Sequence, residues 1–358
     1  MDVKLWNTKI PVIKTLYWIL VLIIAFFIFI NFLQVSGIGK KQEASFDKAI
    51  TGTAYRPFAY RVFLPIVANI LNPLVPKRAA LKFDTVLDTI VGNQIIMKKL
   101  RGNKFLRQVA IILLIMYLSL VGFVFAIWRL IKDLGYGSKT QCIFPLLALI
   151  GCIPFFNGFG YMYDLPVLFF SAMGLLFMFE KKWRWFLIIF ACATLNKETS
   201  IFLFAIFAIY FYKKMSGREF LLLSAYQISI YGLLHGIIMF VFRNNPGSIV
   251  EWHFDDQVDY LKSVIQTTPL LIVYWTTAIA IITTLIVYKW HDKSLLLRTA
   301  LWVLPVFLIL YILWGAPREI RGLLEVYPTV SILLLPPPAS NLNEQSGFPP
   351  LATGSLHN

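Results

Sequence analysis

Apolar runs recur along this chain from Ile13 to Pro336, and short polar gaps separate them. A run of about 20 apolar residues forms a helix long enough to cross the roughly 30 Å hydrocarbon core of a bilayer. The pattern therefore predicts one all-α domain, 1–336, folded as a polytopic transmembrane helical bundle of about ten spans. We expect these spans near residues 13–33, 107–128, 142–156, 165–179, 184–196, 200–212, 220–242, 270–289, 300–315 and 322–336.

Lysine and arginine are unevenly distributed between the gaps, and this asymmetry predicts how the spans are oriented. The spans 184–196 and 200–212 are short and could instead form one helix. That helix would hold Lys197 and Glu198 near the middle of the bilayer, where charges are costly. It would also reverse the orientation of everything that follows. Two helices place the basic gaps in the cytoplasm, as the positive-inside rule requires, namely 1–12, 129–141, 180–183, 213–219 and 290–299.

The N terminus is therefore expected in the cytoplasm, and the protein in the inner membrane of a bacterium. The stretch 34–106 becomes a long extracytoplasmic loop. Within it, Phe58–Val75 has the composition of a short helix lying in the membrane interface. The tail 337–358 is rich in Pro, Ser, Asn and Gly, a composition that predicts disorder.

Composition agrees with a membrane protein. Hydrophobic residues make up 58% of the chain and charged residues 14%, which is too few charges to cover a water-facing surface. The net charge of +15 is scattered over loops between spans, where it suits contact with an anionic bilayer surface. We therefore expect the lipid bilayer as a partner and no nucleic acid.

Residue types suited to chemistry fall on the extracytoplasmic side of this topology, in five separate loops. The first loop carries Asp47, Arg56 and Arg61. The other four contribute Asp164 in NGFGYMYDLP, Lys197 and Glu198 in TLNKETS, Glu251, His253, Asp255 and Asp256 in EWHFDD, and Arg318, Glu319 and Arg321 in GAPREIRGLLEVYP. Carboxylates and guanidinium groups that converge on one membrane face indicate a polar site there.

Most of these groups also have an ordinary structural interpretation. Asp164 stands two residues before a proline, and an aspartate often caps a helix with a proline in its first turn. Lys197 and Glu198 are residues that a solvated turn between two helices would contain. Arg318 and Arg321 could meet lipid headgroups at the start of the last span.

The EWHFDD loop has the residue types of a divalent-cation site. Its candidate ligands are His253, Asp255 and Asp256. Residue type alone is weak evidence for a metal, however, and we expect neither a metal nor another cofactor.

A carboxylate beside several arginines at a membrane face suits one reaction class. The carboxylate takes a proton from an acceptor hydroxyl while cations stabilise a departing phosphate. Arginine is the natural partner because its planar guanidinium holds two phosphate oxygens at once. The membrane setting indicates that the phosphate belongs to a lipid.

Three stretches carry a resemblance to a known family. FDKAITGTAYRPFAYRVFLPIVANIL places Asp47 ahead of a Gly/Tyr turn and an aromatic, Pro/Leu-rich segment. YDLPVLFF through TLNKETSIFL has a short acidic loop, two helices around a basic turn, and then a polar turn with Lys197 as its basic residue. APREIRGLLEVYPTVSILL has Pro-Arg ahead of a Pro-containing final span. In order and spacing over most of residues 13–336, the chain resembles the class C (GT-C) glycosyltransferases.

The resemblance implies an integral-membrane enzyme that moves a sugar from a polyprenyl-phosphate-linked donor to an acceptor on the extracytoplasmic face, with inversion at the anomeric carbon. Asp47 and Asp164 would be its catalytic carboxylates, with Asp47 as the general base. The substrate-binding residues would be Arg56, Arg61, Lys197, Glu198, Arg318, Glu319 and Arg321. The phosphate is a good leaving group, so this chemistry needs no nucleotide or metal.

A transporter or a non-catalytic assembly subunit for lipid-linked saccharides is the alternative. Transporters usually place paired ionisable residues near the bilayer midplane and often contain internal repeats. This sequence shows no repeat, and its charges gather at one membrane edge, which favours the enzyme. A non-catalytic scaffold remains open at this point.

The topology is testable by labelling single cysteines from each side of sealed vesicles. We expect a cysteine at Lys181 to react from the cytoplasmic side and a cysteine at Glu251 from the opposite side, because three spans separate the two positions. Labelling of both positions from the same side would contradict the predicted orientation.

Overall fold

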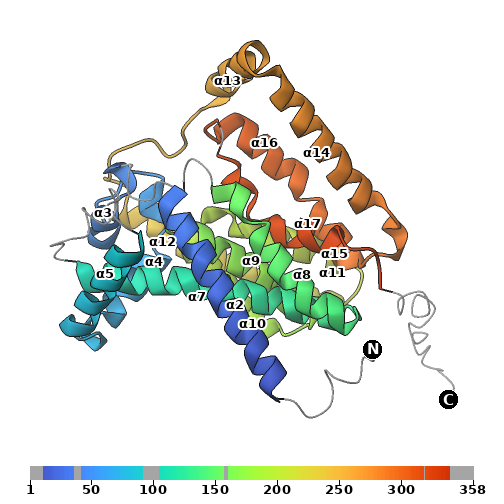
Figure 1. Ribbon diagram of the computed structural model, residues 1–358, viewed down its shortest axis with the longest axis horizontal. Helices are drawn as coiled ribbons and strands as arrows, with labels where there is room; N and C mark the ends of the chain where they lie inside the picture. Colours follow the sequence, from blue (N-terminus) through green and yellow to red (C-terminus); the bar gives the residue numbers. More distant parts are fainter. Residues whose placement is uncertain (1–10, 36–41, 92–104, 157–159, 318, 339–358) are drawn as a thin grey trace.

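The computed structural model describes residues 11–35, 42–91, 105–156, 160–317 and 319–338. The regular elements in these ranges are helices, so the predicted all-α class is confirmed (Figure 1). The predicted tail, apart from residues 337 and 338, and the site residue Arg318 lie outside the described residues.

Six helical segments of the described chain are long and apolar enough to cross a membrane, and the protein is accordingly a multi-pass membrane protein. The first two are α2 (Pro11–Val35) and α7 (Leu106–Asp133). The third joins α8 (Ser138–Ile150) to the 3-10 turn η4 (Ile153–Phe156). The others are α12 (Gly217–Val241), α14 (Pro269–Val287) and the pair α15 (Leu295–Leu301) and α16 (Leu304–Trp314).

Three shorter apolar helices lie between η4 and α12: α9 (Asp164–Phe179), α10 (Trp183–Asn196) and α11 (Ile201–Phe211). Their bounds match the predicted segments 165–179, 184–196 and 200–212 within one residue. Nearly every side chain of α9 is buried, because this helix is apolar on all sides and packs between α7 and α10. The centre of the bundle is therefore α9.

The remaining elements are short or amphipathic. The first loop contains η1 (Gln42–Ala44), α3 (Phe46–Thr51), η2 (Phe58–Tyr60), α4 (Phe63–Leu71), η3 (Asn72–Leu74) and α5 (Lys77–Val91). The later connections contain η5 (Glu198–Ser200), α13 (Phe254–Thr267), η6 (Trp290–Asp292) and η7 (Ile320–Leu323), and α17 (Tyr327–Leu333) is the last helix. The helices α5 and α13 were not expected from the apolar pattern.

Two sequence-based expectations need correction. The segment 322–336 contains only α17, whose seven residues cover about 10 Å at 1.5 Å per residue, too little for a span. Here Pro328 stands in the first turn of α17 and a run of prolines follows its end, so the apolar run stops short of a long helix. The expected interfacial helix Phe58–Val75 is broken near Arg61, where the Val62 amide donates to the Leu195 carbonyl of α10 instead of continuing a helix.

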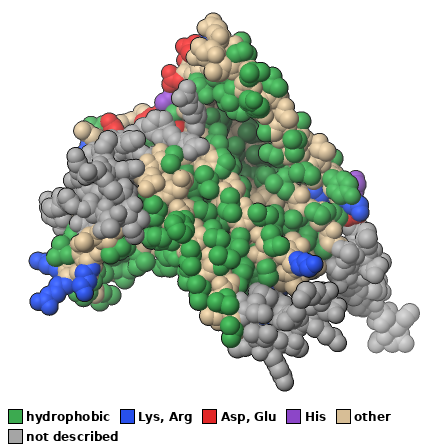
Figure 2. Space-filling model, in the orientation of Figure 1, with side chains coloured by type: hydrophobic (Ala, Val, Ile, Leu, Met, Phe, Trp, Pro, Cys, Tyr) green, Lys and Arg blue, Asp and Glu red, His purple; other side chains and the backbone are tan. Residues whose placement is uncertain are grey.

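The first loop and the connection between α12 and α13 lie together, as the expected topology requires. The Arg56 amide donates to the Pro246 carbonyl (2.8 Å), and its guanidinium donates to the Gly247 carbonyl (2.7 Å). In Figure 1, the axes of α2 and α14 are roughly parallel but the chain runs in opposite directions along them, with the end of α2 and the start of α14 toward the upper side. Figure 2 shows acidic side chains near α13 and basic ones near the far end of α14, on a mostly hydrophobic face.

Helices α7 and α9 approach closely at Gly122. A Cβ atom added there would lie 2.5 Å from Cε2 of Phe169, which a real Cβ does not tolerate. We therefore expect Gly122→Val to force the two helices apart and destabilise the fold by about 1–3 kcal/mol, as overpacking typically does. Thermal unfolding in detergent measures this, with Gly232→Val in α12 as the control because nothing lies within 4 Å of its added Cβ. Equal melting temperatures for the two variants would contradict the close packing.

Candidate functional site

Two arginines from distant parts of the chain meet at a pair of tyrosines. Tyr161 and Tyr163 precede α9, and their rings are stacked with centroids 5.3 Å apart. The Arg61 guanidinium lies 4.1 Å from the centre of the Tyr163 ring and donates to its hydroxyl. The Arg321 guanidinium lies 4.2 Å from the centre of the Tyr161 ring. Cations over aromatic faces are held both by charge and by packing, so the tyrosines orient both guanidinium groups.

Three carboxylates neutralise these arginines. Arg61 pairs with Glu198 at 2.9 Å. Arg321 pairs with Asp164 at 3.1 Å and with Glu319 at 2.8 Å. Only 9% of the Arg61 side chain and 11% of the Arg321 side chain is exposed, so each cation depends on its partners.

The electrostatics keep these pairs ionised. Burial alone would raise the pKa of Glu198, but the charge and hydrogen bonds of Arg61 outweigh it and lower this pKa to about 2. Burial alone would lower the pKa of Arg321, but the charges of Asp164 and Glu319 raise it instead. A carboxylate in such a pair holds a cation well and takes up a proton poorly.

Asp164 does more than begin a helix. It is the first residue of α9, one position after the N-cap residue Tyr163. One carboxylate oxygen accepts from the Tyr161 amide at 2.8 Å, and the other accepts from Arg321. The helix-cap interpretation is therefore wrong: Asp164 fixes the turn that carries Tyr161 and joins it to Arg321.

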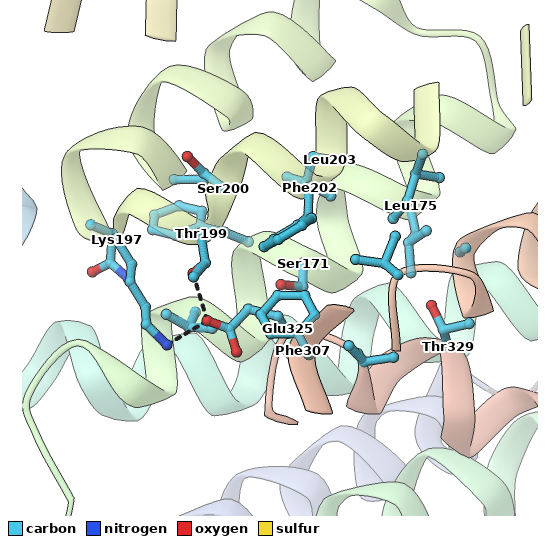
Figure 3. Close-up of a pocket in the computed structure, with 18 residues that line it drawn as sticks. Ser171, Leu175, Lys197, Thr199, Ser200, Phe202, Leu203, Phe307, Glu325 and Thr329 are labelled. Atoms are coloured by element: carbon cyan, nitrogen blue, oxygen red, sulfur yellow. Dashed lines mark hydrogen bonds and ion pairs between the residues drawn. The ribbon is translucent and has the colours of Figure 1, made fainter. Parts of the chain in front are cut away.

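Lys197 is also buried in an ion pair. Its ammonium lies 2.5 Å from Glu325, and Thr199 donates to the same carboxylate oxygen at 2.7 Å (Figure 3). The Lys197 and Glu325 side chains are 10% and 9% exposed. Because Glu198 beside them pairs with Arg61, the interpretation of a solvated turn is wrong. The pair adjoins a small pocket of about 30 Å³ whose walls come from α9, α11, α16 and α17.

A larger cavity of about 190 Å³ brings several of these groups together. Arg61, Arg321, Glu198 and Glu319 form its charged wall, and Phe58, Tyr161 and Trp314 contribute aromatic surface. The segment between α12 and α13 lines the other side with Ile249, Val250, Glu251 and His253. The candidate site is this cavity, with Asp164 bound behind it to Arg321.

Other predicted site residues lie elsewhere. Asp47 is exposed on α3 and is not among the residues that line the cavity. Arg56 has a structural role, since it holds the connection after α12.

His253 contacts Asp256 at 2.8 Å through Nδ1 and Glu251 at 3.4 Å through Nε2. Within the described ranges, no three of the His, Cys, Asp and Glu side chains are grouped as a metal site, so His253, Asp255 and Asp256 find no support as ligands.

Three residues that hold the predicted charged side chains were missed from the sequence. Tyr161 and Tyr163 stand two residues apart just before Asp164, and Glu325 follows Glu319 in the last loop. The signal for Glu325 was Lys197 itself, since a lysine in an apolar setting needs a counter-charge. No family model, curated protein or solved structure matches this chain.

Removing one member of a buried pair should be costly. Arg321→Ala leaves Asp164 and Glu319 without their shared cation, and we expect a loss of about 3–5 kcal/mol in unfolding free energy. The control is Lys262→Ala on α13, whose pair with Asp259 is largely exposed and should contribute little. Denaturant titration in detergent gives both values, and similar losses in the two variants would contradict the role assigned to Arg321.

Proposed function

We propose that this protein is an integral-membrane glycosyltransferase of the class C type, which moves a sugar from a polyprenyl-phosphate donor to an acceptor on the extracytoplasmic face. One observation carries the proposal: two buried, ionised guanidinium groups share one cavity in a multi-pass membrane protein. We assign the phosphate to a lipid because the cavity belongs to a multi-pass membrane protein, which a lipid-linked donor can approach within the bilayer.

The arginines suit a phosphodiester. Each guanidinium has five N–H donors, and the hydrogen bonds of Arg321 to Asp164 and Glu319 use one donor on each of its two terminal nitrogens. Donors therefore remain for a ligand. Two guanidinium groups and three carboxylates leave the site with no excess positive charge, so a singly charged sugar phosphodiester is disfavoured less than a more highly charged nucleotide.

The rest of the cavity suits a sugar. Glu198 and Glu319 offer oxygens that accept hydrogen bonds from sugar hydroxyls. Phe58, Tyr161 and Trp314 offer flat apolar surfaces against which the C–H face of a sugar ring packs. This mixture of aromatic and carboxylate groups supports a site that binds a sugar over one that binds only a lipid phosphate.

In the reaction, an acceptor hydroxyl attacks the anomeric carbon and the bond from that carbon to the phosphate oxygen breaks. The electron pair leaves with the phosphate, whose charge Arg61 and Arg321 stabilise. A base must take the hydroxyl proton. The role of base assigned to Asp47 stays a prediction, and Asp47→Asn tests it: loss of turnover with donor binding intact would assign the base to Asp47.

A transporter or assembly subunit for lipid-linked saccharides is the second candidate. The observation that favours it is the buried pair Lys197 and Glu325, since transporters place paired ionisable residues inside the bundle. Transfer of label from a polyprenyl-phosphate-linked sugar to an added acceptor by the purified protein distinguishes the two. Label that leaves the lipid supports the enzyme, and label that stays on intact lipid through every acceptor tested contradicts it.

The phosphate site makes a separate prediction. Arg61→Lys keeps the charge but loses the planar fork, and we expect donor affinity to fall about tenfold to a hundredfold, the equivalent of 1.5–3 kcal/mol. Arg243→Lys is the matched control, because Arg243 is exposed and packs on Phe240 outside the cavity. Binding of a fluorescent polyprenyl-phosphate sugar measures the effect, and equal affinity in both variants would remove Arg61 from the phosphate site.

A further inference from the structure

A strap of residues 245–257 crosses one side of the cavity, and its first end is fixed to the first loop. Asn245 donates to the carbonyls of Gly52 (2.9 Å) and Ala54 (2.7 Å). At Gly247 the backbone has φ +93°, and an added Cβ would lie 2.7 Å from the Arg56 carbonyl oxygen. Only glycine allows this close approach, so the strap is held against the first loop by its backbone.

The second end of the strap is fixed to α16. The His253 amide donates to the Leu313 carbonyl at 3.1 Å, and the Gln257 side chain donates to the Gly315 carbonyl at 2.8 Å. Between the two fixed ends, Ile249, Val250 and Glu251 line the cavity. The strap therefore holds the Glu251 side chain at the cavity rather than leaving it on a free loop.

Glu251 differs from the other carboxylates that line the cavity. Glu198 and Glu319 each bind a guanidinium group at 3 Å or less, and the Glu198 pKa is lowered to about 2. Glu251 instead faces Nε2 of His253 at 3.4 Å, and Asp256 holds the other ring nitrogen at 2.8 Å. Glu251 therefore faces an imidazole, whereas Glu198 and Glu319 each face a guanidinium group.

Exposure places Glu251 on the acceptor side. Its side chain is 44% exposed, whereas those of Arg61 and Arg321 are 9% and 11% exposed. The cavity thus has a buried wall of arginines paired with carboxylates and an open acidic rim. A lipid phosphate bound at the wall would present its sugar toward the rim, where an acceptor from outside the membrane arrives.

Resting on the proposed function, we propose that Glu251 is the proton acceptor of this site, with His253 and Asp256 as positioning residues. As the acceptor oxygen bonds to the anomeric carbon, its proton passes to a carboxylate oxygen of Glu251. The bond from the anomeric carbon to phosphate breaks, and the phosphate leaves with the electron pair. His253 keeps the carboxylate aimed into the cavity, and Asp256 keeps the imidazole in place.

The test compares three acid-to-amide variants in the labelled-sugar assay: Glu251→Gln, Asp47→Asn and, as control, Asp255→Asn, an exposed acid on α13 that does not line the cavity. We expect Glu251→Gln to lower turnover by about 10²–10⁴-fold while donor affinity and melting temperature stay near wild type. Formate should partly restore turnover to Glu251→Ala, because a small carboxylate can occupy the space left by the side chain. His253→Gln should lower turnover without changing donor affinity, and Asp255→Asn should match wild type.

Two results separate the failure of this proposal from the failure of the proposed function. Near-normal turnover in Glu251→Gln, with loss in Asp47→Asn, overturns the role of Glu251 and leaves the glycosyltransferase standing. Wild-type protein that binds the donor but transfers no sugar to any acceptor overturns the function, and the role of Glu251 falls with it.

Discussion

The end of the bundle where the first and last loops meet depends on the neutralisation of two buried guanidinium groups. Arg61 comes from the first loop and finds Glu198 137 residues later, and Arg321 comes from the last loop and finds Asp164 157 residues earlier. A buried charge left without its partner costs several kcal/mol. The four connections that carry these residues therefore stabilise one another, because separating any pair would leave a buried charge without its partner. The ion pair of Lys197 and Glu325 joins the start of α17 to the same group of loops.

This constraint also creates the site. The tyrosine pair and the carboxylates fix the direction of each guanidinium before any ligand arrives. Binding therefore costs little side-chain conformational entropy. The helices beneath supply rigidity, since α9 is buried on all sides and carries Asp164 in its first turn. Around them, α14 stands with most of its apolar side chains exposed, which suits a surface in contact with lipid (Figure 2). The paired arginines thereby line a polar cavity in a bundle whose outer helices suit contact with lipid.

The sequence predicted the parts of this structure that follow from local apolarity. The bounds of α9, α10 and α11 were close because each is a continuous apolar run with polar residues at both ends. The prediction that 322–336 spans the membrane was wrong. The mean apolarity of a segment does not show that prolines limit its helix to seven residues. Helix α13 was missed because its apolar side chains alternate with acids and give no continuous run.

Convergence of charged residues on one site was predicted, but their partners were not. Arg61, Asp164, Glu198 and Arg321 do meet, whereas Asp47 lies apart on α3 and Arg56 has a structural role. Pairing depends on which loops the bundle brings together, and no local pattern contains that information. The tyrosines were overlooked for the same reason, since an aromatic residue near a membrane surface is ordinarily an interface anchor.

The proposed function requires Arg61 and Arg321 together to bind a lipid phosphate. The most direct measurement is a cryo-EM structure of the protein in a lipid nanodisc with a polyprenyl monophosphate. We expect phosphate density in the cavity within hydrogen-bonding distance of both guanidinium groups, with the prenyl chain leaving toward the bilayer. Phosphate density only at the opposite membrane face, or a cavity that stays free of phosphate at saturating lipid, would contradict it.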